Sequence, residues 1–127
     1  MKLIRKMQFS LIALFIVNFV SAQGKLASSA EVATGNINGA TITVKYGSPS
    51  VKARQIWGAL VPFNQVWRAG ANEATTFETD KDLMIEGSKL PAGKYSFFVI
   101  PNEKECTVIF NKIAKQWGSG KYNEKED

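Results

Sequence analysis

Between residues 40 and 46, apolar and polar side chains alternate without a break, with Ile42, Val44 and Tyr46 on one face. Strict alternation with β-branched residues is typical of a strand that has one buried face. The Asn38-Gly39 pair just before this strand is a strong signal for a two-residue hairpin turn. We therefore expect residues 31–34 to be the partner strand.

The second half of the chain predicts four more strands. They are expected at residues 74–79, 83–85, 94–100 and 106–110. Turn residues separate them, most clearly at Leu90-Pro91-Ala92-Gly93, where proline presets φ and glycine accepts a positive φ. Residues 97–100 are apolar on both faces, which is typical of a central strand or of a contact between subunits.

Residues 51–72 follow neither a helical nor a strand period. Gly58 and Pro62 interrupt the apolar residues and exclude a long helix. We expect an ordered loop with one short helical turn. Connections of this length in a small domain are often functional.

Short strands at this spacing favour an all-β fold, either an antiparallel β-sandwich or a partly open barrel. Residues 23–127 suffice for a single β-rich domain of ordinary size. The charged residues 121–127 lead away from the last expected strand, whose edge would then stay unpaired. We therefore expect this domain to lack its C-terminal strands.

Residues 1–22 have the features of a cleavable signal peptide. Lys2, Arg5 and Lys6 precede an apolar run over residues 9–20, and Val20-Ser21-Ala22 supplies the small residues of a cleavage site. The alternative is a membrane anchor, but the run is shorter than the roughly 20 apolar residues of a spanning helix. We expect an exported protein, periplasmic or extracellular, without a membrane span after cleavage.

The charge balance and the residue types exclude several functions. Cleavage reduces the 16 basic residues to 13 against 11 acidic ones, so the net charge falls from +5 to +2 and nucleic acid is not an expected partner. Histidine is absent, which excludes Ser–His and Cys–His catalysis. No cofactor, metal or catalytic residue is predicted. The single cysteine, Cys106, is expected to be a buried, inert thiol on its strand.

A polar and aromatic segment is the candidate ligand-binding site. Its five residues are Arg54, Trp67, Arg68, Asn72 and Glu73. An indole face suits a sugar ring, and a guanidinium suits a carboxylate or phosphate. The alternatives are structural: Trp57 and Trp67 would belong to the core, and Arg68 and Glu73 would form an ion pair.

The segment 67–75 spells W-R-x-G-A-N-E-A-T. Together with Leu90-Pro91-Ala92-Gly93 and Gln116-Trp117-Gly118, it resembles a family of secreted bacterial proteins catalogued only as a domain of unknown function. The resemblance covers nearly all of residues 23–127. It implies an exported β-rich domain, draws attention to the same five site residues, and brings no activity.

Three hypotheses follow. The first is a non-enzymatic binding module for a carbohydrate-like or small anionic ligand near Trp67 and Arg68. The second is a carboxylate-dependent hydrolase that uses Glu73 as acid or base. The third is a structural component of the envelope, a homo-oligomer through residues 97–100.

Overall fold

The structure is a computed structural model that describes residues 26–127, so the expected signal peptide lies outside the described residues. The described chain is built from strands and one 3-10 turn. Their bounds are β1 Ser29–Ile37, β2 Ala40–Ser48, β3 Thr76–Thr79, β4 Leu83–Ile85, β5 Ser88–Leu90, β6 Gly93–Pro101, β7 Cys106–Asn111 and η1 Glu124–Glu126.

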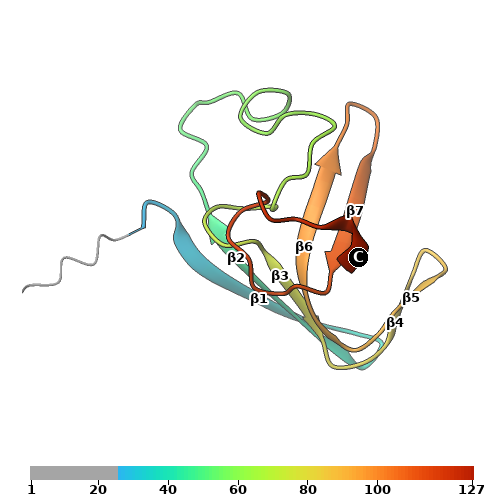
Figure 1. Cartoon of the computed structure of the whole chain (residues 1–127). Coiled ribbons are helices and arrows are strands. Elements are labelled where there is room, and N and C mark those ends of the chain that lie inside the picture. The colour runs from blue at the N-terminus through green and yellow to red at the C-terminus, as the bar shows by residue number, and fades with distance from the viewer. Residues whose placement is uncertain (1–25) are drawn as a thin grey trace, which may run out of the picture.

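Five strands form one antiparallel sheet in the order β1-β2-β3-β6-β7, and β4 and β5 form a separate hairpin (Figure 1). Sequential neighbours pair throughout, except that the β4–β5 hairpin is inserted between β3 and β6. The predicted all-β, antiparallel architecture is confirmed. Within the described part of the chain the large sheet has two unpaired edges, β1 and β7, so it does not close into a barrel.

Three local expectations need correction. β1 runs over nine residues rather than four, because the Asn38-Gly39 turn (φ 49° and 82°) allows continuous pairing from Ile37–Ala40 to Ser29–Ser48. Glu86 and Gly87, with φ of 46° and 82°, form a second such turn, so the unexpected strand β5 pairs with β4. The helical turn lies at η1 and not within residues 51–72.

The core lies on one face of β6 and β7. Phe98 is 0% exposed and packs with Ala74 and Ile109. The C-terminal segment crosses in front of the sheet (Figure 1), and the Tyr122 ring lies 5.3 Å from that of Phe98 at 65°. Residues after β7 thus return to cover the core instead of leading away from it.

A buried polar cluster holds this C-terminal segment in place. Asn111 is 0% exposed; its Nδ2 donates to the Asn123 carbonyl at 2.9 Å and to Asp127 Oδ1 at 2.7 Å. Gln116 Nε2 donates to Ser96 Oγ at 2.9 Å and to Asn111 Oδ1 at 3.2 Å. Buried amides are costly without partners, so these bonds fix where the segment lies.

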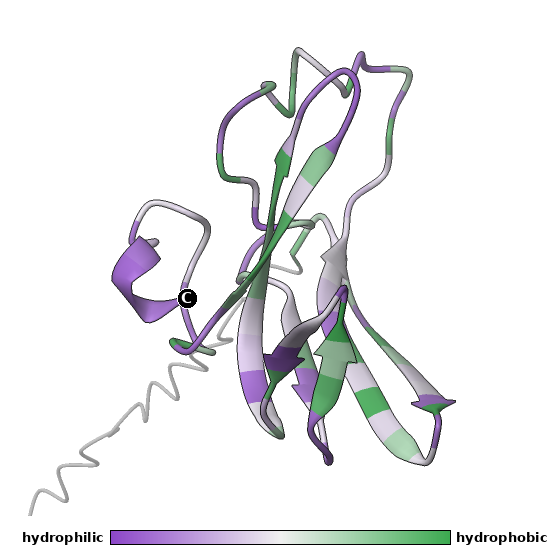
Figure 2. Cartoon of the chain, turned by 90° about the vertical axis from the view of Figure 1, so that its right-hand side faces the viewer, coloured by the Kyte–Doolittle hydropathy of each residue, from purple (hydrophilic) through white to green (hydrophobic). Residues whose placement is uncertain are grey.

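The opposite face of the sheet carries an aromatic cluster. Phe77 stands opposite Tyr95, and Phe97 opposite Phe110. The Phe77 and Phe110 rings meet edge to face at 5.1 Å. Figure 2 shows apolar residues along the β6–β7 hairpin. Phe97 and Phe98 therefore serve opposite faces of a central strand, as the two-sided apolar pattern of residues 97–100 indicates.

Cys106 is exposed, contrary to the prediction of a buried thiol. β7 is an edge strand, and its first residues, Cys106 to Val108, are all exposed. Alternation along the strand predicts which side chains share a face. Whether anything covers that face depends on the rest of the fold.

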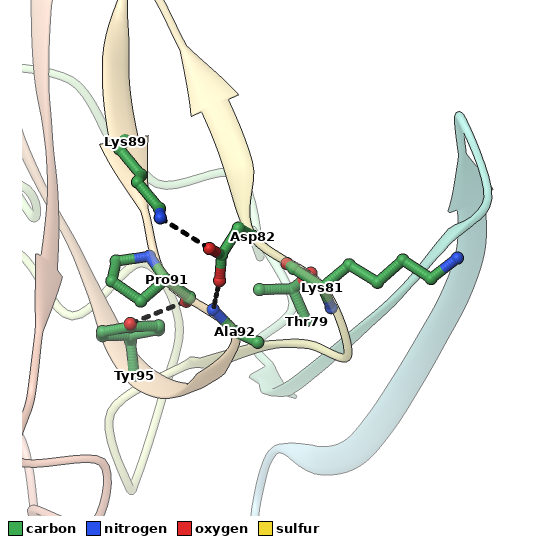
Figure 3. A network of polar contacts seen from close by, with 7 residues as sticks. All are labelled: Thr79, Lys81, Asp82, Lys89, Pro91, Ala92 and Tyr95. Atoms are coloured by element: carbon green, nitrogen blue, oxygen red, sulfur yellow. Dashed lines mark hydrogen bonds and ion pairs between the residues drawn. The ribbon is translucent and has the colours of Figure 1, made fainter.

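The base of the β4–β5 hairpin is tied by a small polar network (Figure 3). Asp82 pairs with Lys89 Nζ at 2.8 Å and accepts the Ala92 amide hydrogen at 2.8 Å, while the Tyr95 hydroxyl donates to the Pro91 carbonyl at 2.8 Å. The hydrogen bonds from Lys89 and Ala92 lower the pKa of Asp82 below its ordinary value of 3.8.

Candidate ligand-binding site

The segment 67–75 is attached to β6 at both ends. Trp67 and Val99 exchange two backbone hydrogen bonds of 2.8 and 2.9 Å, and Phe97 donates to the Thr75 carbonyl at 2.7 Å. Between these points Ala69 (φ 55°) and Asn72 (φ 64°) adopt left-handed conformations. The two left-handed residues turn the chain sharply, so the two halves of the segment face different surfaces.

The first half borders a hollow of ≈ 640 Å³, here called the arginine hollow. Arg54, Trp67 and Arg68 line it, and Lys52 joins them. The other lining residues are apolar or neutral, among them Ser28, Tyr46 and Ser48; none is acidic. Three cations and no carboxylate give the hollow a positive potential, which attracts anions.

Arg68 is the most unusual side chain of the hollow. Its Nε is buried and has no hydrogen-bond partner among residues 26–127. Its Nη1 lies 3.9 Å from the place where a β-carbon on Gly118 would sit. Among residues 26–127 the only ion pair is Asp82–Lys89, so the alternative pairing of Arg68 with Glu73 is not formed. An unsatisfied buried donor costs free energy.

Arg54 is already oriented by its own loop. Its Nε donates to the Val51 carbonyl at 3.0 Å and its Nη2 to the Ser50 carbonyl at 2.8 Å. These bonds hold the guanidinium of an exposed residue at the rim of the hollow. Preorganisation of this kind reduces the entropy lost when a ligand binds.

The two tryptophans of this region do not form a buried core pair. Their rings meet edge to face, with centroids 5.6 Å apart at 88°. Trp57 is 54% exposed, and Trp67 is only partly buried. Trp67 thus offers part of its indole to the hollow, while Trp57 supports it from outside.

Asn72 and Glu73 line a second depression of ≈ 370 Å³, here called the tryptophan groove, with Trp117 and Lys94. Glu73 and Trp117 form an isolated antiparallel bridge, and the Gly118 amide donates to the Asn72 carbonyl at 3.3 Å. The five predicted residues therefore separate into two neighbouring surfaces. Tyr46, Gly47 and Ala71 border both.

The sequence interpretation missed Lys52 in the hollow and Trp117 in the groove. A charge signal for the hollow was present: no acidic residue occurs between Glu31 and Glu73, whereas Lys52, Arg54 and Arg68 do. Trp117 carried no comparable signal, because only the return of the C-terminal segment brings it beside Glu73. Within residues 26–127, no three side chains of the metal-ligating acidic, cysteine or histidine types lie together.

The sequence model of a protein family of unknown function, DUF2911, matches residues 28–127. The chain belongs to this family. The resemblance noted from the motif is thereby confirmed at the level of the family, and DUF2911 membership extends over the whole sheet and both depressions. No curated protein and no solved structure matches the chain. In the described part of this DUF2911 member, no helix is long and apolar enough to cross a membrane.

Proposed function

We propose that this protein is an exported, non-enzymatic binding module that holds an acidic saccharide in the arginine hollow. One observation carries the proposal: Lys52, Arg54 and Arg68 line the hollow and no acidic residue does. A site with cations alone favours a ligand that brings its own negative charge.

Arg68 supplies the specific contact. A guanidinium presents its donors in a planar fork that matches the two oxygens of a carboxylate. Arg68 forms no ion pair within residues 26–127, so no protein carboxylate neutralises its charge, which is available to an anionic ligand in the hollow. Arg54, whose guanidinium donates to the carbonyl oxygens of Ser50 and Val51, adds positive charge at the rim.

Trp67 supplies the apolar contact. It lies next to Arg68 in the chain and lines the same hollow. A sugar ring that stacks on an indole buries its apolar C–H face, and its hydroxyl groups stay free for Ser28, Ser48 and Tyr46 along the wall. This combination selects a saccharide over a bare inorganic anion.

The experiment compares acidic and neutral sugars of the same shape. Galacturonate oligomers and galactose oligomers differ by the carboxylate, and calorimetry measures the binding of each. We expect binding of the acidic series only, weakened by salt because the attraction is electrostatic. The Trp67→Ala/Arg68→Ala double variant should bind at least about 10-fold more weakly, because the loss of even one charge-assisted hydrogen bond costs that much affinity.

Lys89→Ala is the matched control, since Lys89 lies on β5 and does not line the hollow. It removes one positive charge and should leave binding unchanged. Absence of binding by any acidic saccharide, or equal binding by the double variant while it stays folded, contradicts the proposal.

A second candidate, a hydrolase that uses Glu73, is favoured by one observation: Glu31 and Glu73 both line the tryptophan groove beside Trp117. Glycosidases place two carboxylates about 5–9.5 Å apart across the scissile bond. Both glutamates are exposed, whereas burial is the usual means of keeping a general acid protonated. Hydrolysis of a glycan panel by the wild type and none by Glu73→Gln would establish this activity instead.

A further inference from the structure

β1 is an edge strand without the usual protection. Each of its nine residues is exposed, and Val32 is 61% exposed. It pairs with β2 in unbroken register, so no bulge bends it, and its sequence SAEVATGNI contains neither proline nor lysine. Long, regular edges of this kind are normally blocked, because they readily accept another strand.

The backbone groups available on this edge follow from the hairpin. In a two-residue turn the flanking residues, here Ile37 and Ala40, form a hydrogen-bonded pair. Bonding then alternates along the strand, so the N–H and C=O groups of Ala30, Val32, Thr34 and Asn36 point outward. No backbone hydrogen bond to these outward groups occurs within residues 26–127.

We infer that β1 pairs antiparallel with β1 of a second copy, which joins two five-stranded sheets across a twofold axis at Ala33. The register that uses every outward group places Val32 opposite Thr34 of the other copy, and Ala30 opposite Asn36. Antiparallel self-pairing about a central residue is the isologous contact that closed dimers require.

The side chains of β1 are compatible with this register. Val32 and Thr34 are both β-branched, and such cross-strand pairs stabilise sheets. Glu31, the single ionisable residue of β1, stands opposite Gly35, so no like charges meet. Because a strand identical to β1 meets these conditions, we assign the edge to a second copy of this chain.

The dimer also has a consequence for the tryptophan groove. Ala30 and Val32 line this groove and belong to the proposed interface. The twofold axis therefore places the grooves of the two copies on the same face of the joined sheet, one on each side of the axis. This inference does not depend on the arginine hollow or on any ligand there.

Charge pairs introduced across the interface test the register. In Val32→Glu/Thr34→Glu, glutamates face glutamates, whereas in Val32→Glu/Thr34→Lys each glutamate faces a lysine. Both variants should retain the fold, because positions 32 and 34 are exposed and stand opposite Lys45 and Thr43 of β2. Sedimentation should show a dimer for the wild type and for the opposite-charge variant, and at least about tenfold weaker dimerisation for the like-charge variant.

A cysteine at the twofold axis provides an independent readout. The Ala33–Ala33 contact is a non-hydrogen-bonded pair, whose Cα separation of about 4.5 Å lies within the range of a disulfide. In a Cys106→Ser background, Ala33→Cys should form a covalent dimer on oxidation, while the matched Gly35→Cys should not. A monomeric wild type overturns the inference. A like-charge variant that dimerises as strongly as the wild type also overturns it, because the contact would then lie on another surface.

Discussion

The carbonyl oxygen of Gly47 accepts the amide hydrogen of Ala71 at an N–O distance of 3.1 Å, and a β-carbon on Gly47 would lie 2.2 Å from the carbonyl oxygen of Ala71. This close approach joins the end of β2 to the turn between the two halves of the segment 67–75. Both residues border the arginine hollow and the tryptophan groove. Glycine is needed here for space and not for a positive φ.

Gly47→Ala should therefore lower the free energy of unfolding by about 1–3 kcal/mol, since the added methyl forces the backbone of Ala71 away. Denaturant unfolding measures the loss. Gly120→Ala is the matched control, because nothing lies within 4 Å of its added methyl, and it should change stability by less than about 0.5 kcal/mol. Equal effects of the two variants would show that the Gly47–Ala71 contact is not tight.

Arg68→Met should raise the free energy of unfolding by about 1 kcal/mol. The variant keeps a long apolar stem and removes a buried donor that has no partner. Thermal unfolding without ligand measures the gain, and the proposed binding should be lost in the same variant. Lys52→Met, which removes an exposed charge from the same hollow, should leave stability nearly unchanged. A destabilised Arg68→Met would mean that Arg68 has a structural role.

Asn111→Ala should lower the free energy of unfolding by about 1–3 kcal/mol, because it empties a fully buried position and leaves the Ile113 amide hydrogen without its acceptor. The variant also loses the hydrogen bonds from Asn111 to the Asn123 carbonyl and to Asp127. Hydrogen exchange should show the C-terminal segment opening before the sheet. Asn36→Ala removes an exposed asparagine and is the control. Uniform exchange over the whole chain would contradict this role of Asn111.

Burial and the 2.5 Å hydrogen bond to Asp127 raise the pKa of Tyr122 to about 12. The unfolded chain loses this proton near the ordinary value of 10.0, while the folded chain keeps it. The unfolded state is therefore favoured as pH rises from 10.0 to about 12, and the stability contributed by Tyr122 is lost over that range.

Alkaline unfolding of the wild type and of Tyr122→Phe should reveal this difference. The variant should lose less stability between these pH values, and phenolate absorbance should show one tyrosine titrating late in the folded wild type. The Tyr46 and Tyr95 hydroxyls remain in both proteins and cancel in the comparison. Identical pH profiles would contradict the raised pKa.

Local patterns were sufficient to predict most of the strands, although β5 and the full length of β1 were missed. The alternation of Ile42 and Val44 and the Asn38-Gly39 turn predict the β1–β2 hairpin, because both signals act between residues that are close in the chain. The candidate segment was found for a similar reason, because Trp67 and Arg68 are adjacent in the chain and together offer an aromatic face and a cation. The exposure of Cys106 was missed, because coverage of a strand depends on residues distant in the sequence.

By itself, the sequence determined the all-β class, most of the hairpins and the residue types that a site can use, since the backbone period and turn chemistry are local. Only the tertiary structure decided how those residues are grouped. The left-handed turn at Ala69 and Asn72 sends Trp67 and Arg68 to one surface and Glu73 to another. The return of residues 116–118 then places Trp117 beside Glu73, a contact that arises from long-range packing and that no local pattern encodes.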